Sequence, residues 1–213
     1  MKFKNLEMTG FKSFSEKTTV LIEKGLTGIV GPNGCGKSNI VEALRWCMGE
    51  NSAKSMRGSG MEDVIFSGTS NLPSKNISEV KILLDNLEKS GPVQYKEFEE
   101  ISVKRKIEKD KGSKYYINDK EVRARDVQTF FADLSTGAHS PSLISQGRIG
   151  QLVTAKPIER KTILEEAAGI SGIHARRQEA ETRLNAAENN LKRADELKSC
   201  LLYTSPSPRD PTK

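Results

Sequence analysis

The segment Gly31–Ser38, which reads GPNGCGKS, constrains this chain more than any other part of its sequence. It follows the G-x4-G-K-S pattern of a phosphate-binding loop between a strand and a helix. Glycines let backbone N–H groups turn toward phosphate oxygens, and the N-terminus of the following helix favours an anion. We therefore expect Lys37 to bind the β- and γ-phosphates of a nucleotide and the Ser38 hydroxyl to coordinate Mg²⁺. The expected nucleotide contacts in and after the loop are Pro32, Asn33, Gly34, Cys35, Gly36, Lys37, Ser38 and Asn39.

The flanking sequence supplies the strand and the helix that such a loop requires. The apolar run Leu26–Val30 predicts a buried strand that leads into the loop. After the loop, apolar residues recur at helical spacing and predict a helix over 38–48, at Ile40, Val41, Leu44, Cys47 and Met48. Gly49 is placed to end that helix.

The remaining pattern predicts a mixed α/β lobe followed by a long helix. Alternating or β-branched runs predict strands at Phe3–Met8, Thr18–Ile22, Val64–Phe66, around 80–84, around 101–107 and at Tyr115–Ile117. Helices are expected over Arg123–Leu134 and from Pro157 to about Ser199.

The last helix carries an apolar stripe whose members lie 4, 3, 4 and 3 residues apart, namely Ala180, Leu184, Ala187, Leu191 and Ala194. This spacing is typical of the a/d positions of a coiled coil. An ordinary amphipathic helix packed on the lobe gives the same pattern. Beyond it, residues 200–213 contain three prolines within six residues, which are incompatible with a helix. This tail resembles translated adapter sequence, so we expect it to be non-native or disordered.

Composition narrows the class of protein only a little. The formal net charge of +6 over 213 residues is compatible with a polyanionic partner and equally with a basic soluble protein. Three cysteines form no CxxC pair, and two histidines argue against a histidine-based metal site. No window approaches the ~18 apolar residues of a membrane span, and no signal sequence precedes the lobe, so we expect a cytoplasmic protein.

Four motifs resemble those of one family. The loop Gly31–Asn39 resembles that of ABC-type DNA-repair and chromosome ATPases. Ser55–Gly58 and Met61–Phe66 resemble the arginine loop and adjoining strand of the structural maintenance of chromosomes (SMC) family. Ile144–Ile149 resembles its Q-loop and Lys156–Ile170 its neck. The chain is thus similar to the N-terminal half-head of a bacterial SMC protein.

The resemblance implies a domain organisation. Residues 1–157 would form the N-terminal lobe of an ABC-type ATPase head, with a mixed β-sheet and the phosphate-binding loop before its helix. Residues 158–199 would form the neck and the start of a coiled-coil arm, and residues 200–213 the tail.

The resemblance also implies roles for individual residues. Gln146 would be a second Mg²⁺ ligand and would orient the attacking water. Arg57 would couple DNA to ATP turnover, and its planar guanidinium suits a phosphate. Lys12 and Ser13 would lie against the nucleotide. From the sequence alone, Gln146 could equally be a loop residue with local hydrogen bonds and Arg57 a solvated surface charge.

Arg123 and Arg125 match basic positions on the DNA-facing surface of bacterial SMC heads. They would bind phosphates without regard to base sequence. Lys104, Arg105 and Lys106 form another basic run, which we interpret as a solvated face.

The sequence has no apolar run that ends in Asp-Glu, as in a Walker B strand, and no Leu-Ser-Gly-Gly signature. In the SMC family both motifs lie in a C-terminal segment. We therefore expect this chain to bind ATP weakly, if at all, and not to hydrolyse it by itself. The implied partners are its own C-terminal half-head, a second protomer in a homodimer, kleisin-type accessory subunits and DNA of the nucleoid.

The sequence is compatible with two other functions. A RecN-like ABC-type repair ATPase would share the phosphate-binding loop, although the resemblance at Met61–Phe66 and Lys156–Ile170 favours the SMC family. A DNA-binding structural module could use the nucleotide only as a scaffold and not hydrolyse it.

Overall fold

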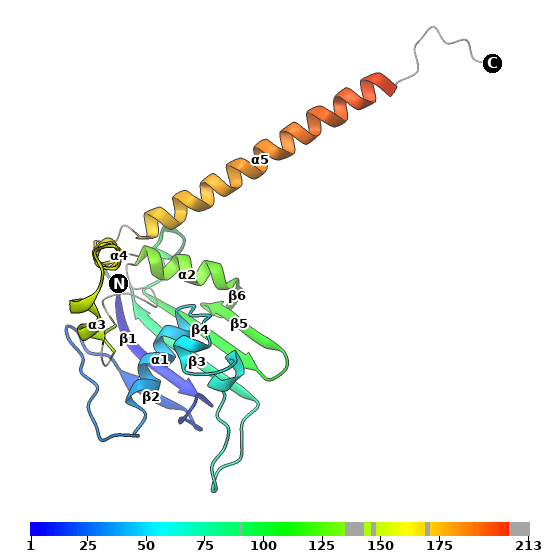
Figure 1. The fold of residues 1–213 in the computed structure, drawn as a ribbon. Coiled ribbons are helices and arrows are strands. Elements are labelled where there is room, and N and C mark those ends of the chain that lie inside the picture. Colours follow the sequence, from blue (N-terminus) through cyan, green and yellow to red (C-terminus); the bar gives the residue numbers. More distant parts are fainter. Residues whose placement is uncertain (90, 135–142, 146–147, 169–170, 205–213) are drawn as a thin grey trace, which may run out of the picture. The chain divides into compact units, whose positions relative to one another are not determined.

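A computed structural model describes residues 1–89, 91–134, 143–145, 148–168 and 171–204. The chain divides into two compact units, Met1–Ile173 and His174–Lys213. The predicted α/β lobe and the long helix after it are confirmed (Figure 1).

One antiparallel sheet organises the N-terminal unit. Its strands are β1 (Lys2–Thr9), β2 (Thr18–Leu21), β3 (Ile77–Asp85), β4 (Glu100–Glu108), β5 (Gly112–Ile117) and β6 (Lys120–Val122), in the order β2-β1-β3-β4-β5-β6. The β3–β4 pair has a regular register, for example Ile82 opposite Val103, whereas the β1–β3 pair shifts register between Phe3 and Asn5. Alternate residues of β3 and β4 are buried, because successive side chains of a strand point to opposite faces.

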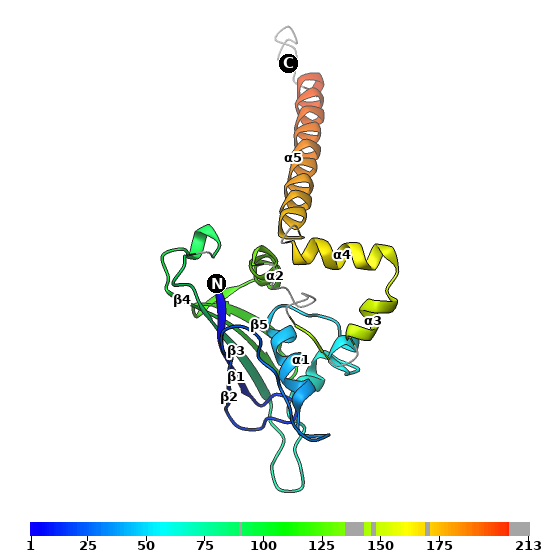
Figure 2. The same cartoon turned by 90° about the vertical axis from the view of Figure 1, so that its left-hand side faces the viewer.

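Helices α1 (Lys37–Cys47) and α2 (Ala124–Asp133) contribute to the core on the buried face of this sheet, and α1 packs on β3 and β4 (Figure 2). The side chain of Trp46 is fully buried, and its ring lies 5.5 Å from that of Phe11. From α2, the core receives Val127, Phe130 and Phe131. This packing fixes the helix that follows the phosphate-binding loop against the sheet.

The predicted strand Leu26–Val30 is wrong: the segment is irregular, and Leu26 and Val30 are 95% and 91% exposed. A strand needs a neighbouring strand for its backbone N–H and C=O groups. In the described part of the chain, all strands belong to the sheet above, and none pairs with this segment. Among the described residues, its backbone therefore has no sheet to join.

The predicted strand Val64–Phe66 is also wrong. Val64 ends the short 3₁₀ helix η2 (Met61–Val64), and Ile65 forms one isolated bridge with Phe11. The backbone N–H of Lys12 donates to the carbonyl of Val64 at 2.7 Å, and that of Phe66 donates to the carbonyl of Gly10 at 2.8 Å. The segment is apolar because it packs under this turn rather than because it enters a sheet. Two further 3₁₀ helices are η1 (Lys54–Met56) and η3 (Val93–Tyr95).

The C-terminal third is helical, as predicted, but is divided into α3 (Arg148–Thr154), α4 (Pro157–Ala167) and α5 (Ser171–Thr204). Helix α3 was not anticipated from the pattern. Helix α5 continues five residues beyond Ser199, because the first tail proline is Pro206 and Cys200–Thr204 can extend the helix. Leu184 and Leu191 of the predicted seam are exposed on α5.

Candidate nucleotide-binding site

The backbone of the phosphate-binding loop has the geometry that its glycines predict. Gly34 and Gly36 have φ angles of 83° and 90°, in the left-handed region that disfavours other residues. A Cβ atom on Gly36 would also lie 3.0 Å from Ser13 Oγ and 3.3 Å from Phe14 Cζ. Gly36 directly precedes α1 and offers no capping side chain, so first-turn N–H groups of the helix are available to an anion.

Lys37 folds back over this loop. Its Nζ atom donates to the carbonyl oxygens of Gly31 at 2.7 Å and Pro32 at 2.5 Å. The Cys35 sulfur lies 3.9 Å from the same nitrogen. The ammonium group therefore stays at the loop, where a phosphate could replace the two carbonyls as its acceptor.

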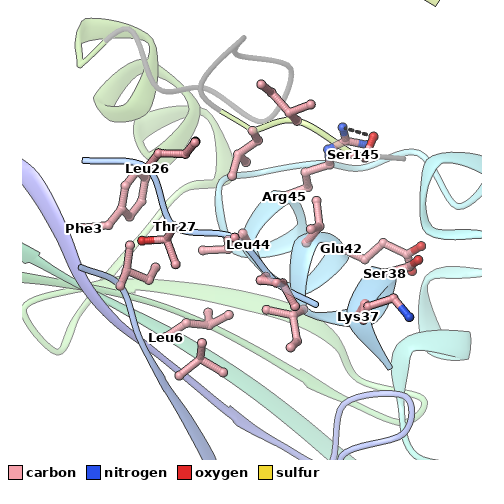
Figure 3. Close-up of a pocket in the computed structure, with 18 of the residues that line it drawn as sticks. Phe3, Leu6, Leu26, Thr27, Lys37, Ser38, Glu42, Leu44, Arg45 and Ser145 are labelled. Atoms are coloured by element: carbon pink, nitrogen blue, oxygen red, sulfur yellow. Dashed lines mark hydrogen bonds between the residues drawn. The ribbon is translucent and has the colours of Figure 1, made fainter. Parts of the chain in front are cut away.

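A cavity of about 1000 Å³ lies beside α1. Figure 3 shows Lys37 and Ser38 at one end of it and Phe3 and Leu26 at the other. Its polar end is lined by Lys37, Ser38 and Arg57, and most of its remaining wall is apolar. The exposed segment that follows β2 forms part of that wall.

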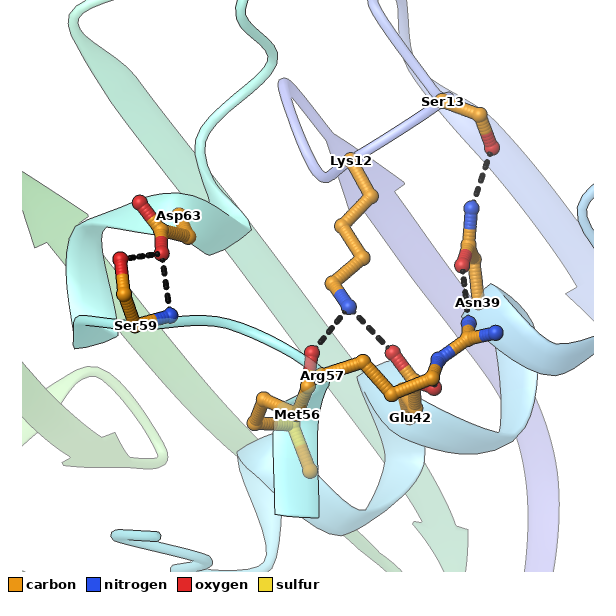
Figure 4. A network of polar contacts seen from close by, with 8 residues as sticks. All are labelled: Lys12, Ser13, Asn39, Glu42, Met56, Arg57, Ser59 and Asp63. Atoms are coloured by element: carbon orange, nitrogen blue, oxygen red, sulfur yellow. Dashed lines mark hydrogen bonds and ion pairs between the residues drawn. The ribbon is translucent and has the colours of Figure 1, made fainter. Parts of the chain in front are cut away.

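Polar side chains from three segments meet at the start of α1 (Figure 4). The amide Nδ2 of Asn39 donates to Ser13 Oγ at 2.8 Å, and Arg57 Nη2 donates to Asn39 Oδ1 at 2.9 Å. The structure thus brings together Ser13, Asn39 and Arg57, which the sequence placed at one site from positions far apart in the chain.

Glu42 lies at the centre of these contacts, although no motif in the sequence includes it. Its Oε2 accepts a hydrogen bond from Lys12 Nζ, and its Oε1 accepts one from Arg57 Nε. Lys12 Nζ also donates to the carbonyl oxygen of Met56. Glu42 is only 7% exposed, and it is the single acidic residue of α1, between Val41 and Ala43. An acidic residue at an otherwise apolar helix position was the signal available in the sequence.

Hydrogen bonds within the loop that carries Arg57 hold its conformation. Asp63 Oδ2 accepts hydrogen bonds from the backbone N–H of Gly60 at 3.0 Å, and from the hydroxyl and backbone N–H of Ser59 at 2.8 and 2.6 Å. These donors, that of Gly60 foremost, lower the pKa of the Asp63 carboxyl, because they favour its charged form. Asp63 therefore stays ionised and holds the turn that follows Arg57.

Arg105 corrects the interpretation of the basic run on β4 as a solvated face. Its side chain is 2% exposed, and its guanidinium lies between the rings of Trp46 and Tyr115, 4.5 and 4.6 Å from their centroids. Burial lowers the pKa of Arg105. Buried residues alternate along β4, and Arg105 lies between the buried residues Val103 and Ile107 on the same face. This alternation indicates burial of Arg105, whereas the run of three basic residues suggests a solvated face.

The other predicted site residues are less connected to the loop. Gln146 lies outside the described residues, but the preceding Ser145 accepts a hydrogen bond from Arg45 Nη2 of α1 at 3.2 Å. Arg123 and Arg125 are exposed at the start of α2. Among the described residues, no cluster of three His, Cys, Asp or Glu side chains could hold a metal ion. The described helices include none that is long and apolar enough to cross a membrane.

Comparison with known families decides the relationship. The sequence pattern described as RecF/RecN/SMC N terminal domain matches residues 2–147, more than half of the chain. The chain belongs to this family. It is 55% identical over 197 residues to the Chromosome partition protein Smc of Cereibacter sphaeroides and 54% identical to that of Rhodopseudomonas palustris. These matches cover 92% of this chain but only 17% of each relative.

Solved structures agree with the sequence relatives. A structure described under ATP-driven dimerization and DNA stimulated activation of SMC ATPases matches with a TM-score of 0.66 and 30% identity, over 78% of this chain and 99% of that one. The Smc head domain of Pyrococcus furiosus, with an extended coiled coil and bound to the C-terminal domain of ScpA, matches with a TM-score of 0.71 and 30% identity, over 95% and 50%. The fold is therefore that of an SMC ATPase head with its helical arm.

Proposed function

We propose that this chain is the ATP-binding N-terminal half of the head of a chromosome-partitioning SMC ATPase that binds DNA. The observation that carries the proposal is the contact between Arg57 and Asn39, because it joins the arginine loop to the first turn of the helix that follows the phosphate-binding loop. Family membership supports ATP as the nucleotide.

The residues present fit Mg²⁺-ATP. The left-handed glycines leave room for phosphate oxygens, Lys37 supplies a cation at the loop, and Ser38 supplies a hydroxyl in the first turn of α1. Bound Mg²⁺ would neutralise charge on the β- and γ-phosphates. Ser38 and Gln146 would hold it, and Gln146 would also orient the attacking water. Lys12, Ser13 and the backbone from Pro32 to Asn39 would complete the nucleotide contacts.

A second half-head completes the site in this proposal. The exposed apolar segment Leu26–Val30 and the apolar wall of the cavity support it, because no strand among the described residues pairs with that segment and the cavity beside it offers apolar surface. The chain spans about a sixth of the length of its relatives, and its sequence contains neither a Walker B segment nor a Leu-Ser-Gly-Gly signature. Hydrolysis would therefore require the C-terminal half-head and a second protomer.

The partners follow from the same relatives. Structures of SMC heads have been described with ATP-driven dimerization and with bound ScpA, and we propose a homodimer with a kleisin-type subunit for the full protein. Arg123 and Arg125, exposed at the start of α2, would bind DNA phosphates at the nucleoid in the cytoplasm. The lobe would comprise residues 1–157, the neck and arm residues 158–199, and a non-native or disordered tail residues 200–213.

Nuclear magnetic resonance of the ¹⁵N-labelled chain tests nucleotide binding even when the affinity is weak. Titration with Mg²⁺-ATP should shift the backbone amides of Gly34, Gly36, Lys37 and Ser38 first. Lys37→Ala should remove the shifts, and Lys106→Ala, on the opposite face of the sheet, should not. Shifts that survive Lys37→Ala would contradict the assignment, and Lys37-dependent steady ATP turnover by this chain alone would contradict the divided site.

A further inference from the structure

We propose that Glu42 is a positioning residue of the nucleotide site, whose carboxylate holds Arg57 and Lys12 against the first turns of α1. The inference rests on the proposed function, because it concerns the same site. It adds a residue that is neither in the phosphate-binding loop nor in the arginine loop. Figure 4 shows the two cations converging on this carboxylate from separate loops.

The two oxygens of the carboxylate are divided between the two cations. Oε1 accepts from Arg57 Nε and Oε2 accepts from Lys12 Nζ, so neither cation can leave without exposing a buried oxygen. The contacts also close a ring, since Lys12 binds the carbonyl of Met56, the residue before Arg57. Lys12 therefore fixes the backbone of the arginine loop while Glu42 fixes the arginine side chain.

Backbone strain at the same two residues points to a function for this arrangement. Lys12 and Arg57 have φ angles of 46° and 53°, a left-handed conformation that is costly for residues with a Cβ atom. Strain of this kind persists where surrounding contacts enforce it, and it gathers at functional sites. Here both strained residues donate to Glu42, so the carboxylate is one of the contacts that enforce their conformation.

The geometry also specifies where the guanidinium of Arg57 lies. Nε is used by Glu42 and Nη2 by Asn39, one residue after Ser38. Both acceptors are on α1, three positions apart, so they orient the plane of the guanidinium along one side of the helix. Without Glu42, Arg57 would keep the neutral acceptor Asn39 as its only side-chain acceptor among the described residues, and its exposed side chain would move into solvent.

A ligand-free measurement on the chain tests the inference directly. Arg57 Nε–Hε should give a protected signal in ¹H–¹⁵N spectra. Glu42→Gln should make its hydrogen exchange at least about tenfold faster, because the charge of the acceptor is lost and the new NH2 group presents N–H donors to one of the two cations. Glu42→Asp should retain most of the protection, and Glu16→Gln, an exposed control, all of it. Unchanged exchange in Glu42→Gln would overturn the inference.

Nucleotide affinity gives a second test, because a positioning role and a purely electrostatic effect of Glu42 predict opposite changes in affinity. Removing a negative charge beside a phosphate site should by itself strengthen Mg²⁺-ATP binding. Positioning predicts the reverse, a weakening of about three- to tenfold in Glu42→Gln that disappears in an Arg57→Ala background. Stronger or additive binding would overturn the inference. If Lys37→Ala leaves wild-type binding intact, the proposed function fails, and the exchange measurement alone decides the role of Glu42.

Discussion

The guanidinium of Arg105 donates a hydrogen bond of 2.8 Å from Nη1 to the carbonyl oxygen of Trp46 and lies 4.5 Å from the centre of its ring. The same Nη1 donates to the carbonyl of Glu50 at 2.7 Å. Trp46 lies in the last turn of α1, where helix carbonyls lack partners within the helix, and Glu50 lies three residues beyond its end. A strand residue thus terminates the helix whose other end forms the candidate phosphate site.

Replacing Arg105 by Met should destabilise the fold, because the apolar stem remains while the carbonyls of Trp46 and Glu50 each lose a charged donor. The loss of a hydrogen bond from a charged donor costs about 1.5–3 kcal/mol of unfolding free energy, and the Trp46 carbonyl keeps the backbone N–H of Gly49 at 3.2 Å. Arg105→Lys should recover only part of the loss, because a single ammonium cannot reproduce the planar stacking between two rings. Urea unfolding measures the difference. Lys106→Met, on the other face of β4, should change the free energy by less than ~0.5 kcal/mol.

Alanine substitutions at two glycines should distinguish the stability cost of backbone strain from that of a steric clash. Gly25 has a φ of 93° with open space around a Cβ atom, so Gly25→Ala should cost about 1–2 kcal/mol. Gly10 has a φ of 65°, and a Cβ atom there would lie 2.3 Å from the carbonyl oxygen of Ile77. Gly10→Ala should therefore cost about 1–3 kcal/mol more. Equal losses in thermal unfolding would show that the turn before Lys12 can move away from β3.

The sequence predicted most of the sheet, because alternation in β3 and β4 reflects a half-buried surface directly. It predicted the helix that follows Gly31–Ser38, because apolar residues at helical spacing are a local signal. It failed at Leu26–Val30, whose apolar run indicates burial but cannot say whether the covering layer lies in the same chain. It also failed at Glu42 and Arg105, since burial of a charged side chain depends on distant partners, such as Lys12, 30 residues from Glu42, and Trp46, 59 residues from Arg105.

Alkaline pH should destabilise the fold through two buried acids. Burial raises the pKa of Cys47 from 9.0 to about 12 and that of Tyr115 from 10.0 to about 12. Their contribution is complete below about pH 9, because both states are then protonated. It falls as the pH rises toward 12, since the unfolded chain releases these protons first. Tyr115→Phe should flatten the decline above pH 10 in urea unfolding, and an unchanged slope would contradict the assignment.

Tyr115→Phe has a separate effect at neutral pH. The Tyr115 hydroxyl donates to Asn51 Oδ1 at 3.2 Å, so its removal should lower the free energy of unfolding by about 1 kcal/mol at pH 7. The comparison between wild type and variant must therefore use the change in the free energy of unfolding with pH and not its absolute value at one pH.

Alkylation should distinguish the three thiols and report on the nucleotide. Cys47 is buried, and its raised pKa keeps it protonated, so it should react with iodoacetamide only after unfolding. Cys35 and Cys200 are exposed and should both react. Mg²⁺-ATP should slow alkylation of Cys35, which lies in the loop beside Lys37, and leave Cys200 unaffected. Peptide mass spectrometry measures each rate, and Lys37→Ala should abolish the protection. Equal slowing at Cys200 would indicate a general effect of the nucleotide on the reagent.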